Sequence, residues 1–118
     1  MFNRLVKLLS MLSESQVQKI QEKSANENDS LSLMFGALSD PGRMQVFKIL
    51  LEHNDICVSD MANILKVSVP AASRQLTILE FAGLIKKIRK GQSTCFKILW
   101  DSEKTRMLIQ ILKKGETR

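Results

Sequence analysis

Residues 68–83 read Ser-Val-Pro-Ala-Ala-Ser-Arg-Gln-Leu-Thr-Ile-Leu-Glu-Phe-Ala-Gly. This stretch has the start, the buried face and the end of a helix. The Ser68 hydroxyl can cap the N-terminus, where backbone amides lack helical partners, and the proline two positions later costs little in a first turn. Leu76 and Leu79 share one face at helical spacing. Gly83 tolerates the positive φ that commonly ends a helix, so we predict a helix between Ser68 and Gly83.

Short elements flank this helix on both sides. Residues 60–65 predict a shorter helix and residues 66–67 a tight turn, and two helices joined in this way form a helix-turn-helix. Residues 84–90 and 93–99 predict two strands about a turn at Gly91. The sequence therefore predicts a fold that is mainly α with a small β-wing, a winged helix-turn-helix.

The predicted helix and hairpin carry side chains of the kind that read duplex DNA. Arg pairs well with guanine and Gln with adenine in the major groove, a helix N-terminus favours phosphate, and a basic hairpin can follow the backbone. The candidate DNA-binding residues are Ser68, Val69, Pro70, Ser73, Arg74, Gln75, Lys86, Lys87, Arg89, Lys90 and Gln92. Three points stay open: which of Ser73, Arg74 and Gln75 reads a base, whether Ser68 only caps the helix, and which half of the wing residues faces DNA.

Positive charge is concentrated in the same region. The net charge is +6, and residues 41–118 hold fourteen of the 18 basic and seven of the 12 acidic residues. Within residues 86–90 there are three lysines and one arginine and no acid. Such clustering indicates a polyanionic partner. The alternative is a winged helix that binds a partner protein, and salt-dependent binding to duplex DNA would discriminate between the two.

The N-terminal residues 2–23 predict an amphipathic helix, or two helices divided at a capping box formed by Ser13 and Gln16. The apolar stripe consists of Phe2, Leu5, Leu8, Leu9, Leu12, Val17 and Ile20. A polar break over residues 25–29 is expected to separate this segment from the rest of the chain.

Helix signals continue after the break. Residues 30–38 predict a short helix, and Asp40 as N-cap followed by Pro41 begins a longer one. The longer helix is apolar on most of its surface, so we expect it in the core, with Asn54 in the left-handed conformation at its end. Ile56-Cys57-Val58 predicts a short extended piece.

Two further caps have alternatives. Ser59 or Asp60 is expected to cap the helix over residues 60–65, and Asp101 or Ser102 the last helix, over residues 102–114. The apolar face of the last helix consists of Met107, Leu108, Ile111 and Leu112. Residues 115–118 are expected to form a loose tail.

We expect three functional segments. Residues 30–100 form the DNA-binding domain, residues 1–24 a dimerising extension, and residues 101–118 a dimerising helix with its tail. The apolar faces of the two end segments exceed what a small monomer can bury, which favours packing across a two-fold axis. The alternative for the N-terminal stripe is that it folds back on its own domain.

Three segments resemble a known family. Residues 37–43, Ala-Leu-Ser-Asp-Pro-Gly-Arg, resemble the Ala-Leu-x-Asp-Pro-Thr-Arg signature of the ArsR-type winged-helix repressors. Residues 56–61, Ile-Cys-Val-Ser-Asp-Met, resemble the family's Leu-Cys-Val-x-Asp-Leu segment. Residues 67–76, Val-Ser-Val-Pro-Ala-Ala-Ser-Arg-Gln-Leu, resemble its Val-Ser-Gln-Pro-Ala-Val-Ser-Arg-His-Leu segment. The match covers about residues 31–100.

The resemblance implies a homodimeric transcriptional repressor whose N- and C-terminal helices form the dimer and whose DNA binding is weakened by an inducer. Three residues depart from the family pattern. Val69 stands in place of Gln and Gln75 in place of His, so the resemblance does not imply an operator sequence. Gly42 stands in place of Thr, a change that we expect to be benign.

No metal site and no cofactor is expected. The family's arsenic- or cadmium-type site uses two cysteines in the segment that matches residues 57–59, where this chain has Cys57 but Ser59. Its zinc-type site uses Asp and His on the final helix, and the only histidine here is His53. Zinc needs three or four ligands. The six methionines are better explained as core residues than as copper ligands.

An enzyme is not expected either, because the chain has no Gly-rich phosphate loop and no paired catalytic acids. The apolar runs are short, so no membrane span is expected. Two cysteines do not make a secreted disulfide framework. We therefore expect a cytoplasmic protein whose partners are duplex DNA and a second copy of itself.

The two cysteines, Cys57 and Cys95, are candidate redox residues. Alternation along strands places Phe96 toward the core, which puts Cys95 on the outer face with Lys97. Cys57 is predicted on the same face of the neighbouring strand, so the two thiols can lie within reach of a disulfide. The alternative is two unrelated thiols in a reducing cytosol.

Overall fold

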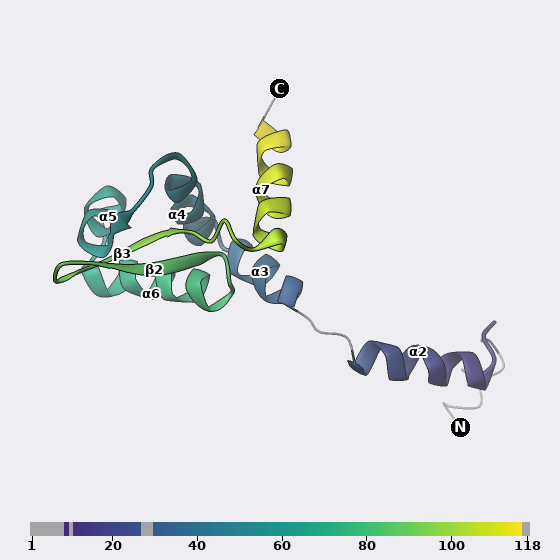
Figure 1. Ribbon diagram of the computed structural model, residues 1–118. Coiled ribbons are helices and arrows are strands. Elements are labelled where there is room, and N and C mark those ends of the chain that lie inside the picture. Colours follow the sequence, from purple (N-terminus) through teal and green to yellow (C-terminus); the bar gives the residue numbers. More distant parts are fainter. Residues whose placement is uncertain (1–8, 10, 27–29, 117–118) are drawn as a thin grey trace.

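The computed structural model of the chain describes residues 9, 11–26 and 30–116 (Figure 1). The elements in order are α2 (Glu14–Asn26), α3 (Ser30–Leu38), α4 (Pro41–Glu52), β1 (Ile56–Cys57), α5 (Val58–Leu65), α6 (Val69–Phe81), β2 (Ile85–Lys90), β3 (Ser93–Ile98) and α7 (Glu103–Glu116). The three strands form one antiparallel sheet in the order β1-β3-β2. The predicted fold class is confirmed: α5 and α6 form the helix-turn-helix, and β2 and β3 form the wing.

Polar side chains cap helices at predicted positions. The side chains of Asp40, Ser68 and Ser102 each accept a hydrogen bond from the backbone amide three residues later, at 3.0, 3.2 and 3.2 Å. Ser102, not Asp101, therefore caps the last helix. Ser13 and Gln16 exchange the two hydrogen bonds of a capping box, at 2.8 and 3.2 Å, so a separate helix begins at Glu14.

The end of α4 differs from the prediction. Asn54 does not take the left-handed conformation, which belongs to Asp55 with a φ of 60°. The next residue, Ile56, must enter the sheet opposite Phe96. The change of chain direction is therefore completed immediately before β1, and Asp is one of the residues that tolerate this conformation.

The start of α5 also differs. The helix begins at Val58, and its N-cap is Cys57, whose side chain makes no capping hydrogen bond. Ser59 and Asp60, the predicted caps, lie inside the first turn. Because β1 leads directly into α5, no residue separates the strand from the helix, and Asp60 instead supplies a negative charge near the positive end of the helix.

The two chain ends extend further as helix than predicted. Helix α2 continues through Asn26, into the predicted polar break, and residues 27–29 lie outside the described residues. The predicted stripe residues Phe2, Leu5 and Leu8 also lie outside them. Helix α7 continues through Glu116, so residues 115 and 116 are helical instead of loose, and residues 117–118 are outside the description.

The wing follows a regular register. Residues 85–90 pair with residues 98–93, and Gly91 has a φ of 62° in the connecting turn. Gly83 has a φ of 83° and, as predicted, ends α6. The wing therefore begins immediately after α6, which fixes its position beside that helix.

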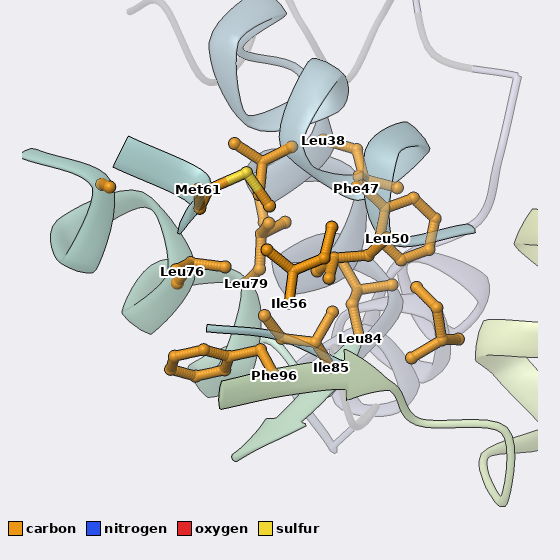
Figure 2. Packing of buried hydrophobic residues seen from close by; sticks show 14 of the residues in the cluster. Leu38, Phe47, Leu50, Ile56, Met61, Leu76, Leu79, Leu84, Ile85 and Phe96 are labelled. Carbon is orange, nitrogen blue, oxygen red and sulfur yellow. The ribbon is translucent and has the colours of Figure 1, made fainter. Parts of the chain in front are cut away.

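The buried face of α6 lies at the centre of the core (Figure 2). Ala72, Leu76 and Leu79 are fully buried. They pack with buried side chains of α4, α5, the sheet and the turn before it, namely Val46, Phe47, Leu50, Met61, Leu84, Ile85, Phe96 and Ile98. α4 is confirmed as a core helix, and burial of these apolar side chains is the main stabilising contribution.

The last helix is attached to this core. Leu108 and Ile109 are buried, and the hydroxyl of the fully buried Thr105 donates to the Gly83 carbonyl at 3.1 Å. On the predicted apolar face, Met107 and Ile111 are instead 57% and 61% exposed. The face is therefore divided between the protomer's own core and the surface.

Helix α2 does not pack on its own domain. Its residues from Glu14 to Ala25 are all exposed, including the apolar Val17 and Ile20. Figure 1 shows it apart from the other helices. The described part of the N-terminal stripe is thus not folded back. Among residues 9, 11–26 and 30–116, no helix has the length and apolar character to cross a bilayer.

The central position of α6 leads to a stability prediction. Leu76→Ala should lower the free energy of unfolding by about 2–5 kcal/mol, because it leaves a cavity in the packed core. Ile78→Ala on the same helix is the matched control, since Ile78 is 36% exposed and should cost well under half as much. Urea denaturation followed by circular dichroism measures both. Equal losses would contradict the central role of the buried face.

Candidate nucleic-acid interface

The outer surface of α6 lies between two hollows. Val69, Ser73 and Thr77, spaced by four residues, form one stripe that faces the wing. Arg74 and Gln75 line the opposite hollow, next to the start of α4. The helix therefore projects as a ridge with different side chains on its two flanks, and the major groove of DNA is wide enough to admit an α-helix.

The wing presents its basic residues on two faces. Lys87 and Arg89 lie opposite Phe96 and Thr94 on β3, so these four side chains share one face. Lys86 and Lys90 alternate to the other face. Lys87 and Thr94 line the same hollow as the wing-facing stripe of α6. Lys87 and Arg89 therefore lie on the face of the wing that is turned toward α6, and Lys86 and Lys90 lie on the opposite face.

This hollow, which we call the wing groove, has a volume of about 390 Å³. It is lined by Val69, Ser73 and Thr77 of α6, Lys87 and Thr94 of the wing, and Ser59 of α5. Its lining offers hydroxyls and one ammonium group, and no acid is among the residues around it. Hydroxyls and cations are the partners that proteins use for phosphates of the DNA backbone.

The predicted residues differ in their exposure. Ser68, Val69, Pro70, Arg74, Lys87, Arg89, Lys90 and Gln92 are exposed, whereas Ser73, Gln75 and Lys86 are half-buried. The Ser68 hydroxyl is used in capping, as described above, and Val69 is 50% exposed beside it. Arg74 is therefore the exposed candidate base reader with a side chain able to form two parallel hydrogen bonds to guanine.

Gln75 is held by contacts with α4. Its side-chain oxygen accepts a hydrogen bond from the Arg43 guanidinium at 3.4 Å, and the same guanidinium group donates to the Ala37 carbonyl at 2.7 Å. These contacts join α6 to α4 and to the end of α3. A base contact by Gln75 would have to compete with Arg43.

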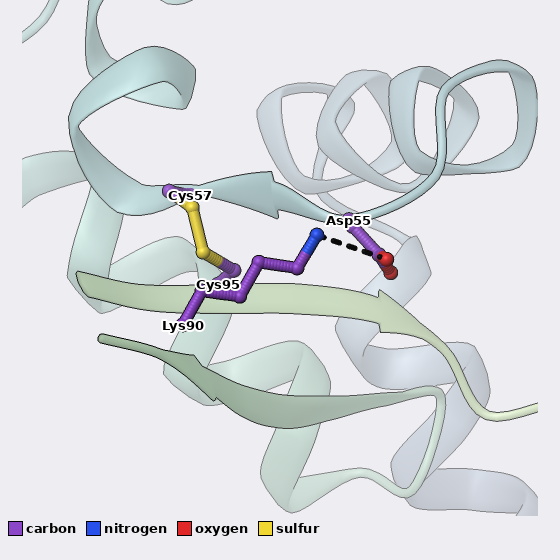
Figure 3. Close-up of polar contacts among 4 residues, drawn as sticks. All are labelled: Asp55, Cys57, Lys90 and Cys95. Carbon is purple, nitrogen blue, oxygen red and sulfur yellow. Dashed lines mark hydrogen bonds and ion pairs between the residues drawn. A yellow bond between two sulfur atoms is a disulfide. The ribbon is translucent and has the colours of Figure 1, made fainter. Parts of the chain in front are cut away.

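Lys90 has a partner at the other edge of the sheet. Its Nζ lies 3.2 Å from an Asp55 carboxylate oxygen (Figure 3). Arg89 donates to the Thr94 hydroxyl at 3.2 Å. Exposed ion pairs contribute little to stability and are readily exchanged, so both cations can still meet phosphate.

Sequence reasoning missed some polar residues of the wing groove, among them Thr77, Thr94 and Ser59. Thr77 could have been found, since it follows Ser73 and Val69 at intervals of four on the helix. Thr94 and Ser59 carry no comparable signal, because their positions depend on how β3 and α5 pack against α6. Gln92 lies in the wing turn, where the sequence placed it.

The two cysteines are bonded to each other. Cys57 lies directly opposite Cys95, their Cα atoms are 3.6 Å apart, and their sulfur atoms form a disulfide (Figure 3). The predicted proximity is confirmed. Cys95 is not exposed on the outer face as predicted but fully buried, because Cys57 and Ile88 flank it in the same row of the sheet.

A cadmium-type site does not fit these residues. Ser59 occupies the position of the second cysteine, and the Cys57 sulfur is bonded to Cys95. Within the described part of the chain, no three His, Cys, Asp or Glu side chains gather at one point.

Comparisons with known proteins agree with this geometry. A family model described as "Bacterial regulatory protein, arsR family" matches residues 40–87. The cadmium resistance transcriptional regulatory protein CadC of Listeria innocua is 31% identical over 85 residues, 71% of each chain. The transcriptional repressor SdpR of Bacillus subtilis is 32% identical over 87 residues, 70% of this chain and 93% of that protein.

Among solved structures, a homodimeric winged helix-turn-helix DNA-binding domain from Mycobacterium bovis superposes with a TM-score of 0.64 at 19% identity, covering 93% of this chain and 94% of that one. At this identity the likeness concerns the fold. With a helix-turn-helix and basic wing in place and relatives matched over most of their length, the chain belongs to the ArsR family of DNA-binding transcriptional regulators.

Proposed function

We propose that this chain is a transcriptional repressor that binds duplex operator DNA as a homodimer and is released by an inducer. The observation that carries the proposal is the wing groove, where Lys87 lies beside the wing-facing stripe of α6. In this arrangement α6 enters the major groove and the wing follows the adjacent backbone. The relative SdpR is named as a transcriptional repressor, which supports repression over activation.

The exposed candidates take different roles in this proposal. Arg74 reads a base edge, and Ser73 adds a contact from the same turn of α6. The N-terminal residues Ser68, Val69 and Pro70 approach a phosphate or a thymine methyl group. Lys87 and Arg89 contact phosphates from the wing, with Gln92 at its tip.

The ends of the chain form the dimer in this proposal. An apolar hollow of about 360 Å³ lies between α3 and α7 and is lined by Phe35 and Ile111, among others. Phe35 is 55% exposed, and Met107 of α7 is exposed nearby in sequence. Residues 101–118 therefore pack against a second copy, together with residues 1–24, leaving residues 30–100 to bind DNA. The homodimeric neighbour supports this assembly. As a DNA-binding regulator, the dimer would act in the cytoplasm.

The opposite faces of the wing provide a matched test. Lys87→Ala should weaken binding to specific and non-specific duplex alike and reduce the slope of log affinity against log salt by about one per protomer. Lys86→Ala, one residue away on the other face, should change both much less. Fluorescence anisotropy at several salt concentrations measures the two variants. Equal effects would remove the wing groove from the interface.

Arg74 provides the test of base reading. Arg74→Ala should reduce affinity for the operator by about 1–3 kcal/mol and relax specificity, because a bidentate contact to guanine is lost. Arg74→Lys keeps the charge but not the planar fork, so it should restore non-specific affinity without restoring specificity. Competition binding against scrambled duplex gives both quantities. Full specificity in the lysine variant would make Arg74 a phosphate contact.

The dimer is tested on α7. Ile111→Glu should convert the protein to a monomer in sedimentation velocity and abolish tight operator binding, because it places a charge in an apolar interface. Gln110→Glu adds the same charge beside it and leaves the apolar surface unchanged. A chain beginning at Ala25 separates the two end segments: an unchanged dimer would show that α7 alone supplies the interface.

A further inference from the structure

We propose that Cys57 and Cys95 form a reversible redox site in which Cys57 reacts with a hydroperoxide and Cys95 resolves the product. The inference rests on the proposed function only for its effect on DNA binding. The two residues are 38 positions apart in sequence yet directly opposed in the sheet. No other cysteine is present in the chain.

The two cysteines have different surroundings, which assigns their roles. Cys57 is half-buried, lines the wing groove, and is the N-cap of α5. The positive end of a helix favours a thiolate, the reactive form of cysteine. Cys95 is fully buried, so an oxidant in solution reaches Cys57 first.

The reaction is balanced with a hydroperoxide as oxidant. The Cys57 thiolate attacks the outer peroxide oxygen, the O–O bond breaks, and a sulfenic acid and an alcohol or water are formed. The Cys95 thiol then attacks the Cys57 sulfur, loses its proton, and displaces water as the disulfide forms. Two thiols lose two electrons in total, and a dithiol reductant returns them by exchange.

The bond connects the two parts of the DNA-binding domain. β1 leads directly into α5, the first helix of the helix-turn-helix, whereas β3 is a strand of the wing. β1 has only two residues in the sheet, so few hydrogen bonds hold it to β3. The disulfide and the exposed Lys90–Asp55 ion pair connect these elements (Figure 3).

A change of redox state alters how firmly the wing is held. Bonded sulfur atoms lie about 2.0 Å apart, whereas free thiols can turn away from each other. Reduction removes the covalent link between β1 and β3, the strand with which Lys87 and Arg89 are paired, so the position of the wing can differ between the two states. In a reducing cytosol the dithiol is the resident state. For a repressor released by its signal, oxidation is then the releasing event.

The chemistry is tested on the full-length reduced protein, without DNA. Cys95→Ser treated with hydrogen peroxide should form a sulfenic acid at Cys57 that dimedone traps, detected by mass spectrometry. Cys57→Ser should show at least about tenfold slower labelling of Cys95 under the same conditions. Equal labelling, or faster labelling of Cys95, would overturn the assignment of roles.

The regulatory effect is tested with a duplex from the region upstream of the protein's own gene. Peroxide should weaken binding of the parent by about fivefold or more, dithiothreitol should restore it, and Cys95→Ser, which cannot form the disulfide, should bind like the reduced parent before and after peroxide. Unchanged parent affinity, despite a disulfide seen by mass spectrometry, would overturn the switch. Absence of binding by the reduced parent would instead contradict operator binding, and the labelling result would stand by itself.

Discussion

The burial of one face of α6 is the constraint on which the rest of the structure depends. Leu76 and Leu79 are fully buried against α4, α5 and the sheet, so the helix can neither rotate nor slide without exposing core side chains. Its outer residues are therefore held in fixed directions. Rigid placement of a few side chains is what reading a base sequence demands, and here the same helix supplies both the packing and the proposed contacts.

The arrangement of the wing follows from that placement. Gly83 ends α6 in the left-handed conformation, and β2 begins two residues later. The hairpin is thus connected to the recognition helix by a very short segment, and strand alternation then decides which lysines face α6. Lys87 lies in the wing groove and Lys86 does not, a difference set by one position in the register.

Features that depend on neighbours within four residues could be predicted from the sequence. The caps by Ser68 and Asp40 are of this kind, as are the glycine turns and the alternation of the wing. The contact of Gln75 with Arg43, 32 residues away, could not be predicted, because it depends on how α6 packs beside α4. The burial of Cys95 was misjudged for the same reason: alternation gives the face of a strand, whereas exposure depends on what covers that face.

The hydroxyl of Thr105 donates to the carbonyl of Gly83, at the junction of α6 and the wing. A buried hydrogen bond of this kind is costly to leave unmade, so the first turn of α7 and the base of the wing move together. If α7 forms the dimer as proposed, the distance between the two recognition helices depends on a short path through each protomer. The spacing between operator half-sites that the dimer tolerates would then be narrow, and a mutation at Thr105 would alter which operators are bound without changing a proposed DNA contact.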